Sequence, residues 1–398
     1  MRSARVSDLV AKGLLRVEDG NHGNDRPRPH EFVPSGTSFI RAADMTSGFV
    51  DFTNAGQINP EARARIRKGI GAPGDVILSH KGTVGKVAVA PVDSPEFVCS
   101  PQTTFWRSLD ESEISQGFLR YVLISEHFAR QLDLLKGQTD MAPYVSLTGQ
   151  RSMTLDLPDI ARQRAIVEVL GALDDKIAAN AKLIDVAKDL AVLSLARYEP
   201  TVSLGKVVKQ HKATINPSLM TANEVAHFSL PAFDVGQTAE VTRPIDIKSS
   251  KFEVRQPCVL ISKLNPRFPR VWNVAEVPAI PGLASTEFLV LEPSYSSTTF
   301  LWAELLQPSF GATLESKVAG TSGSHQRVRP ADLLETLVVD PREVEPELQG
   351  KITSVGLLAV QSRAENETLV ASRDALLPQL MSGKLRVREA ELLVEELV

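Results

Sequence analysis

The stretch DIARQRAIVEVLGALDDKIAANAKLIDVAKDLAVLSLARY, residues 159–198, decides the fold of this chain. Its apolar positions succeed one another at alternating steps of four and three, with one polar residue among them: Ile166, Leu170, Leu173, Ile177, Asn180, Ile184, Ala187 and Ala191. Such a heptad pattern is typical of a helix that packs along a second helix. The pattern therefore predicts a long helix with a narrow contact seam, and it leaves open where the partner helix lies.

The partner is found in the same chain, because the seam recurs near the C-terminus. Gln163-x-x-Ile166 recurs as Gln349-x-x-Ile352, and the later helix positions Asn180, Leu183 and Leu190 recur as Asn366, Leu369 and Leu376, all at an offset of 186. Two related seams in one chain predict two helices that pack against each other.

The segments before the two helices are related as well. Phe118-Leu119 recurs as Phe300-Leu301, and residues 75–81 lie opposite residues 257–263, both at an offset of 182, so Lys81 is expected to face Lys263. The short strand-like runs and helical pieces of these segments indicate an α+β fold. The offset drifts by only four residues from 182 to 186 over the whole repeat, which indicates a tandem duplication.

The sequence therefore predicts two tandem α/β globular domains and two long helices packed as an antiparallel coiled coil, related by a pseudo-two-fold axis. The expected boundaries are 1–158 and 201–342 for the two globular domains, 159–200 and 343–388 for the two helical spacers, and 389–398 for an acidic C-terminal extension. About 38 helical residues would make a rod of roughly 57 Å with the globules at opposite ends. The repeated Asn180 and Asn366 favour a buried pair that fixes the helix register, the alternative being an exposed position on each helix.

Composition and charge narrow the classes of protein. The 43% hydrophobic content suits a large apolar core, and the net charge of −4 gives no support by itself for a nucleic-acid partner. Cys99 and Cys258, which form no Cys-x-x-Cys motif, are expected to be buried free thiols in a reducing cytoplasm. No apolar run reaches the roughly 18–20 residues of a membrane span, so no membrane partner is expected.

The doubled pattern resembles the specificity subunit of type I restriction–modification systems over about residues 1–388. The residues that carry the resemblance are Gly74-Asp75-Val76-Ile77, Leu155-Asp156-Leu157-Pro158 after the loop 137–147, Gln163-x-x-Ile166, and LLPQLMSGKL at residues 376–385. The chain departs from that family at Arg162, where a Glu is usual, and at residues 266–269, which replace the Gly-rich turn 82–85.

The resemblance implies a non-catalytic subunit that reads an asymmetric, bipartite target in double-stranded DNA, one recognition domain to each half-site. It implies two DNA adenine methyltransferase subunits docked on the helical spacers, joined by translocase–nuclease subunits. S-adenosylmethionine, and ATP with Mg²⁺ where a nuclease subunit is present, would be used by these partners, and no cofactor would be bound by this chain. The alternative is a scaffold or specificity-like subunit of a non-restriction defence or methylation system.

Candidate DNA contacts are polar and basic residues in predicted loops, since Arg and Lys bond guanine, Asn and Gln bond adenine, and all can reach phosphates. In the first domain they are His22, Asn24, Arg26, Arg28, Lys81, Lys86 and Gln138; in the second they are Lys263, Arg267, Arg270, His325, Gln326 and Arg327. Each can also be read as an ordinary solvated side chain. The seam residues Ile166, Leu170, Leu173, Ile177, Asn180, Ile184, Ile352, Asn366, Leu369 and Leu376 are expected to form the spacers and to dock partners.

Catalytic patterns are missing from the sequence. None of the Asn-Pro pairs at Asn59, Asn216 and Asn265 continues into the Asn-Pro-Pro-aromatic motif that holds a flipped adenine. Gly85-Lys86 is followed by Val87 in place of the Ser or Thr of a phosphate-binding loop. The seven histidines show no metal-ligand spacing, so neither a metal site nor an enzyme activity is expected.

Overall fold

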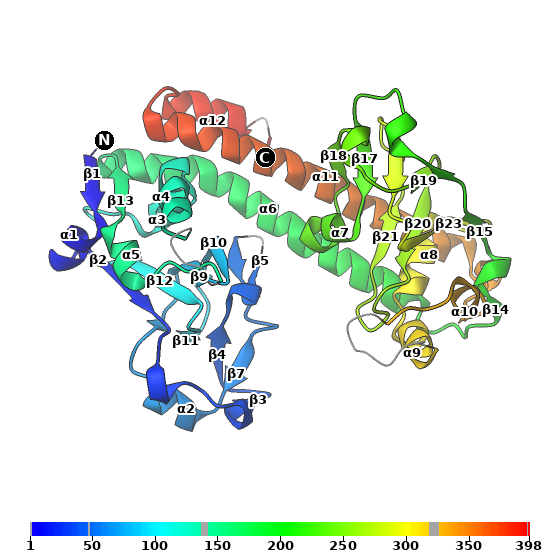
Figure 1. Ribbon diagram of the computed structural model, residues 1–398, viewed down its shortest axis with the longest axis horizontal. Helices are drawn as coiled ribbons and strands as arrows, with labels where there is room; N and C mark the ends of the chain where they lie inside the picture. The colour runs from blue at the N-terminus through cyan, green and yellow to red at the C-terminus, as the bar shows by residue number, and fades with distance from the viewer. Residues whose placement is uncertain (1, 47, 137–141, 318–325, 396) are drawn as a thin grey trace. The chain divides into compact units, whose positions relative to one another are not determined.

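The computed structural model describes residues 2–46, 48–136, 142–317, 326–395 and 397–398. The chain divides into two compact units, unit 1 with Met1–Ala178 and Glu367–Val398, and unit 2 with Ala179–Asn366. Two long helices, α6 (Ile160–Leu195) and α11 (Pro346–Ser382), contribute to both units. Each unit therefore contains one mixed α/β globule and a part of each long helix (Figure 1).

The globule of unit 1 is built on a six-stranded sheet of order β2-β12-β9-β10-β6-β5 beside a five-stranded sheet of order β3-β7-β4-β11-β8. Its strands are β1 (Arg2–Arg5), β2 (Leu15–Asp19), β3 (Phe32–Val33), β4 (Thr37–Ile40), β5 (Met45–Thr46), β6 (Phe49–Val50), β7 (Gly56–Ile58), β8 (Ile70–Gly71), β9 (Val76–Lys81), β10 (Thr83–Val89), β11 (Phe97–Cys99), β12 (Thr103–Ser108) and β13 (Thr154–Leu157). Its shorter helices are α1 (Val6–Ala11), α2 (Pro60–Arg65), α3 (Gln116–Ile124), α4 (Glu126–Lys136) and α5 (Leu147–Ser152).

The alternation of side chains along β9 explains how this sheet is covered on both faces. Val76 and Leu78 join the apolar cluster that contains α3 and α6 residues, whereas Ile77 joins Phe97 and Phe105 on the opposite face. Residues 22–34 contain two short 3₁₀ turns, η1 (Gly23–Asp25) and η2 (Pro29–Glu31), and the strand β3.

The globule of unit 2 repeats this plan with a four-stranded sheet of order β15-β23-β20-β21 and a five-stranded sheet of order β16-β19-β22-β17-β18. Its strands are β14 (Val202–Ser203), β15 (Val208–His211), β16 (Thr214–Ile215), β17 (Val225–Phe228), β18 (Glu240–Thr242), β19 (Lys251–Val254), β20 (Cys258–Ser262), β21 (Val271–Val274), β22 (Gly282–Ala284), β23 (Phe288–Pro293) and β24 (Leu337–Val338). Its helices are α7 (Leu230–Gly236), α8 (Thr298–Leu305), α9 (Pro308–Ser316) and α10 (Pro330–Leu334).

The repeat extends to individual hydrogen bonds at the start of each long helix. Gln163 Nε2 donates to the Pro158 carbonyl at 2.9 Å, and Gln349 Nε2 donates to the Pro341 carbonyl at 2.7 Å. The predicted internal repeat is thus confirmed at a polar contact that both units use, buried in unit 1 and part-buried in unit 2.

The register of β9 and β20 corrects one expected equivalence. An isolated bridge joins Lys81 to Tyr144 in unit 1 and Leu264 to Arg327 in unit 2. The counterpart of Lys81 is therefore Leu264, and the expectation that Lys81 faces Lys263 is wrong by one residue. Because a one-residue shift turns a strand side chain to the opposite face, Lys263 lends no support to a role for Lys81.

In unit 1 the two long helices pack antiparallel. Arg162 Nη2 donates to the Leu380 carbonyl at 2.6 Å, and farther along α6 Asp174 receives Arg373 Nη1 at 2.9 Å. Rising residue numbers on α6 therefore meet falling numbers on α11. The predicted seam residues of this part are buried together: Ile166, Leu170, Leu173, Ile177, Leu369 and Leu376.

The same antiparallel packing continues within unit 2. Asn180 is 6% exposed, and its Nδ2 donates to Asn366 Oδ1 at 3.0 Å and to Glu365 Oε2 at 2.7 Å. The predicted asparagine pair is confirmed, and the alternative of an exposed Asn180 is wrong. Ile352 is buried and Ile184 is half-buried. The α+β fold with two long antiparallel helices, predicted from the heptads and the repeat, is confirmed.

In each unit a glycine allows a helix of the globule to approach a long helix closely. The glycine belongs to the globule in unit 1 and to the long helix in unit 2. A Cβ on Gly117 of α3 would lie 2.9 Å from a Val167 methyl group on α6, and a Cβ on Gly356 of α11 would lie 2.0 Å from Thr299 of α8. Close backbone approach thus seats both globules on their helices, which positions the sheets and their loops.

The C-terminal segment is a docked helix, α12 (Val387–Glu395), in which Ala390 and Val394 are buried. Cys99 and Cys258 are buried free thiols, as predicted. Of the helices that the structure describes, none combines the length and the apolar composition that a membrane crossing requires.

Candidate nucleic-acid interface and docking surfaces

One end of the six-stranded sheet gathers several of the predicted DNA contacts of unit 1. Asp19 at the end of β2 pairs with Thr104, Thr103 pairs with Ser79 of β9, and the β9–β10 hairpin turns between Lys81 and Thr83. The loop after β2 and this hairpin tip therefore leave the sheet at the same end.

Two lysines stand at the hairpin tip. Lys81 is exposed, with its Nζ 5.8 Å from the ring centroid of Tyr144. Lys86 is exposed as well, and its Nζ lies 3.4 Å from the Ala42 carbonyl. Neither ammonium group is paired with a carboxylate among the described residues, so both can meet a phosphate or a base edge. Tyr144 is a residue that the sequence patterns missed; only its position across the bridge from Lys81 makes it a candidate.

The loop after β2 divides into one buried and three exposed candidates. His22 is 8% exposed, and its Nε2 lies 2.8 Å from the Cys99 carbonyl. Burial lowers the pKa of His22, so the ring is held neutral inside the fold and is not a cation at the surface. Asn24, Arg26 and Arg28 are exposed and remain candidates. Gln138 lies outside the described residues.

In unit 2 most of the predicted basic residues are already engaged by oxygen atoms of the chain itself. Lys263 Nζ donates to the Thr286 carbonyl, and burial lowers the pKa of Lys263. Arg270 forms two hydrogen bonds with Asp234 at 2.7 and 3.0 Å, and Arg327 reaches Glu287 at 2.9 Å. The predicted cluster of Lys263, Arg267 and Arg270 is therefore not a set of free charges, because neighbouring oxygens already hold two of its members.

The β20–β21 tip of unit 2 keeps one exposed base and one exposed ring. Arg267 is exposed, and its guanidinium carbon lies 5.8 Å from the ring centroid of Phe268, which is 65% exposed. Asn265 begins this turn with φ +49, a conformation that Asn tolerates better than most residues. Gln326 is half-buried, and His325 lies outside the described residues. Phe268 was not among the predicted contacts, although an aromatic residue next to Arg267 in a polar loop is a pattern that the sequence shows.

A buried ion network, also missed by the sequence patterns, joins the first globule to both helices within unit 1. Asp174 is 2% exposed and accepts from Arg120 Nη2 at 3.0 Å, from Arg373 Nη1 at 2.9 Å and from the Tyr121 hydroxyl at 2.8 Å. Burial, followed by the charge of Asp174, raises the pKa of Tyr121, so this hydroxyl stays protonated and donates. Each carboxylate oxygen is thus satisfied, which makes the junction of globule and spacer rigid.

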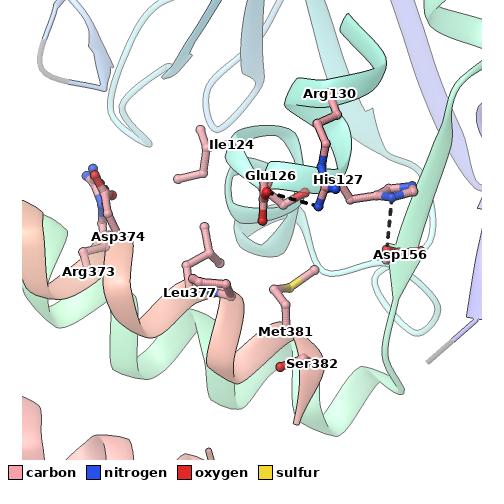
Figure 2. A pocket seen from close by; sticks show the side chains of 12 residues that line it. Ile124, Glu126, His127, Arg130, Asp156, Arg373, Asp374, Leu377, Met381 and Ser382 are labelled. Carbon is pink, nitrogen blue, oxygen red and sulfur yellow. Dashed lines mark hydrogen bonds and ion pairs between the residues drawn. The ribbon is translucent and has the colours of Figure 1, made fainter. Parts of the chain in front are cut away.

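A groove of about 710 Å³ opens in unit 1 between the last turns of α11, the start of α4 and β13. Figure 2 shows Ile124, Leu377 and Met381 at its apolar wall and two pairs of polar side chains at its side. Arg130 lies 3.2 Å from Glu126, and His127 Nδ1 lies 3.8 Å from Asp156 Oδ2. The mixed charges and the apolar wall suit a side chain of a protein partner better than a phosphate.

In unit 2 the position equivalent to this groove is occupied by the side chain of Gln307. Gln307, the counterpart of Ser125 at the repeat offset of 182, donates from Nε2 to the Val192 carbonyl on α6 at 2.7 Å. The groove is therefore a feature in which the two units differ.

The seam residues expected to dock partners are largely covered by the chain itself. Ile166, Leu170, Leu173 and Ile352 are at most 2% exposed. They form the helix pair, and an external partner would meet the outward-facing positions of α6 and α11 instead. Within the described residues, no group of three His, Cys, Asp or Glu side chains is placed to hold a metal ion.

This chain is similar in sequence to one protein family and in fold to a solved structure. Residues 31–188 match a family model described as the type I restriction modification DNA specificity domain. Residues 31–188 are therefore similar to a type I restriction–modification specificity domain. The resemblance read from the sequence motifs is thereby confirmed over residues 31–188.

Solved structures of specificity subunits resemble this chain to different degrees. The S subunit of a type I restriction–modification system from M. genitalium is 14% identical, with a TM-score of 0.53 over 95% of both chains. The HsdS subunit from Thermoanaerobacter tengcongensis is 19% identical, with a TM-score of 0.37 over 96% of this chain and 97% of that one. At 14% identity, the M. genitalium structure supports the fold of this chain and nothing further. A comparison with curated proteins yields no match.

Proposed function

We propose that this specificity chain is the non-catalytic sequence-recognition subunit of a type I restriction–modification complex. Each globule reads one half of an asymmetric, bipartite target in double-stranded DNA, and the spacer helices dock methyltransferase subunits. The observation that carries the proposal is the duplicated architecture with unlike tips. Both units share the bridge and the Gln–Pro hydrogen bond, whereas Lys81 stands where unit 2 has Leu264.

The unlike tips support two different half-sites. The unit 1 tip presents Lys81 and Lys86, two point charges, whereas the unit 2 tip presents Arg267 beside the exposed Phe268. A lysine bonds a phosphate or one base edge, and an arginine can bond a guanine with two parallel hydrogen bonds. Different side chains on one scaffold are what reading of two unlike sequences requires.

The chemistry belongs to partner subunits in this proposal. Two DNA adenine methyltransferase subunits would use S-adenosylmethionine to methylate a flipped adenine in each half-site. Translocase–nuclease subunits, where present, would use ATP and Mg²⁺. The specificity chain itself would bind no cofactor, and it would act with these partners in the cytoplasm.

The test is to co-express the chain with the adenine methyltransferase encoded beside it and to map methylated bases across a genome. We expect methylation at a split motif, and replacement of residues 1–158 by those of a relative should change one half of the motif only. Deletion of seven residues between Ala172 and Ala187, with the matching seven of α11, should keep both halves and change the gap. Methylation without this chain, or at one continuous motif, would contradict the proposal.

A second candidate is a scaffold that holds methyltransferase-like partners without reading a defined sequence. It is favoured by the net charge of −4 and by the internal pairing of Arg270 and Arg327. Gel shifts of the assembled complex on random and on motif-containing duplexes, over a range of salt concentrations, separate the two. A scaffold shows equal affinity for both duplexes, since phosphate contacts alone carry no sequence information.

A further inference from the structure

The turn between β20 and β21 of unit 2 is fixed by hydrogen bonds and by a buried proline. The Asn265 amide donates to the Gln326 carbonyl at 2.9 Å, and the Phe268 amide donates to the Asn265 carbonyl at 2.8 Å, which closes a β-turn. Pro266, at the second position of this turn, is buried, and its ring fixes φ at a value that such a turn requires. Arg267, the remaining residue of the turn, and Phe268 are therefore presented from a fixed backbone.

The side chains of Arg267 and Phe268 face solvent together. Phe268 is 65% exposed and lies outside the apolar clusters that the described residues of unit 2 form. Pro269 follows it and restricts its backbone to extended conformations. Within the part of the chain that the structure describes, no carboxylate pairs with Arg267, whereas Arg270 at the foot of the turn is held by Asp234 at 2.7 Å. The turn thus presents one available cation and one available aromatic ring.

Unit 1 carries the same kind of pair at its tip, although the ring comes from a different place. Gly82, with φ +77, and Asn265, with φ +49, each donate a backbone hydrogen bond of 2.9 Å to the segment that crosses the hairpin, so the two turns begin at equivalent positions. In unit 1 the ring belongs to Tyr144 on that crossing segment, with Lys81 Nζ 5.8 Å from its centroid. The unit 2 counterpart of Tyr144 is Arg327, which an ion pair holds. The recurrence of a cation beside a ring at both tips favours a functional role over chance exposure.

The chemistry of the major groove shows what such a pair can contact. The groove admits a two-stranded antiparallel ribbon, and β20 and β21 form one. Among the base edges in this groove the one apolar group is the 5-methyl group of thymine, whereas a guanidinium bonds guanine O6 and N7 with two parallel hydrogen bonds. Base pairs are stacked about 3.4 Å apart. The 5.8 Å between the Arg267 guanidinium carbon and the Phe268 ring centroid therefore suits contacts with neighbouring base pairs.

We propose that Phe268 contacts the 5-methyl group of a thymine in the half-site read by unit 2, next to a guanine that Arg267 bonds. The inference rests on the proposed function and adds to it the composition of one half-site. Phe268 is then a specificity-determining residue, because cytosine lacks the methyl group and turns an amino group to the ring, where its hydrogen bond would be lost. Since the turn is already fixed in the free chain, binding loses little conformational freedom at these two side chains.

The experiment measures how tightly the full chain, assembled with the adenine methyltransferase encoded beside it, binds synthetic duplexes that carry its methylated motif. The half-site read by unit 2 is the half that stays unchanged when residues 1–158 are replaced. Each thymine of that half, on either strand, is exchanged in turn for deoxyuridine, which lacks only the methyl group. We expect one exchange to weaken binding about fourfold, the effect of one buried methyl group.

Protein variants assign that effect to the turn. The complex with Phe268→Ala should bind the thymine and deoxyuridine duplexes equally, because the ring that contacts the methyl group is gone. Leu219→Ala is the matched control, because Leu219 is an apolar residue of the same unit that is 78% exposed; it should keep the fourfold difference. Exchange of the neighbouring guanine for 7-deazaguanine, which lacks the N7 acceptor, should weaken binding by the unaltered complex and leave binding by Arg267→Ala unchanged.

The outcomes separate this inference from the proposed function. Equal binding of all thymine and deoxyuridine duplexes by the unaltered complex, or a fourfold difference that Phe268→Ala keeps, would overturn the inference while leaving the proposed function standing. So would a sensitive guanine that is not next to the sensitive thymine. A uniform loss of affinity in Phe268→Ala, together with loss of a bend in the bound duplex, would assign the ring to insertion between base pairs and would also overturn it. If the complex methylates no split motif, the proposed function itself fails.

Discussion

Removal of the Asp174 carboxylate should destabilise unit 1 more than any single change at its surface. Asp174 is 2% exposed, and it neutralises Arg120 and Arg373, whose side chains are 9% and 15% exposed. Asp174→Ala would leave the buried Arg120 guanidinium without its counter-charge and Arg373 with Asp374 alone. Loss of one partner of a buried ion pair costs about 3–5 kcal/mol. Because Arg373 also reaches Asp374 at 2.8 Å, we expect a value near the lower end, about 3 kcal/mol.

Urea unfolding followed by circular dichroism measures this change. With an m-value of about 3 kcal/mol per molar urea, a loss of about 3 kcal/mol lowers the unfolding midpoint of unit 1 by about 1 M. Asp246→Ala is the matched control, since its pair with Arg243 lies in unit 2 with side chains 48% and 70% exposed. The control should leave the midpoint unchanged within error, because exposed pairs contribute little.

A rescue variant separates lost charge pairing from lost packing. Replacing the whole network by apolar residues, as in Arg120→Met, Asp174→Leu and Arg373→Met together, removes every buried charge at once. Such replacements are often neutral or stabilising, so this triple variant should regain most of the lost stability. The reasoning is refuted if Asp174→Ala unfolds at the same urea concentration as Asp246→Ala, or if the triple variant is less stable than Asp174→Ala.

Local geometry gives three more testable expectations. Gly356→Ala should cost about 1–3 kcal/mol, because its Cβ would lie 2.0 Å from Thr299, whereas Gly350→Ala, with nothing within 4 Å, should be stabilising in the same thermal melt; equal effects would contradict the close approach. The pKa of Glu31 is lowered from 4.5 to about 2, first by the Arg65 hydrogen bonds and then by the Arg28 backbone N–H, so its stabilising effect is complete above pH 4.5 and is lost as the pH falls through about 2. Arg65→Ala should move the Glu31 carboxyl titration seen by NMR upwards towards 4.5, and an unmoved midpoint would count against this pairing. Lys81→Ala with Lys86→Ala should weaken DNA binding by the assembled complex and reduce the slope of log K against log salt by up to about 2, whereas Lys263→Ala should leave the slope unchanged; filter binding at several salt concentrations decides.

Much of the architecture could be predicted from residues that are close together in the chain. The four–three spacing from Ile166 to Ala191 reports which side of α6 is buried, because neighbours on one helix face recur every three or four residues. The recurrence of Asn180 as Asn366 then paired the two helices, and their amide groups do meet at 3.0 Å. Heptad spacing and internal duplication are patterns of the sequence itself, so they can be recognised without the tertiary structure.

The candidate site could be predicted only in part, because exposure and pairing depend on residues far apart in the sequence. Arg267 and Arg270 are close neighbours in one loop, yet Asp234 neutralises only Arg270. The sequence predicts that His22 is a surface residue of a polar loop, yet its side chain is buried and forms a hydrogen bond with the Cys99 carbonyl. Contacts between residues so far apart in the chain cannot be predicted from the spacing of residues in the sequence.

By itself, the sequence determined that this chain is a duplicated α+β protein with two helices that need each other. Only the tertiary structure decided the one-residue register that separates Lys81 from Lys263, the buried charges around Asp174, and the return of α12 beside α11. The physical reason is that the apolar side of a helix is set by residues close together in the sequence. Strand register, charge pairing and the packing of α12 depend instead on contacts between segments far apart in the sequence.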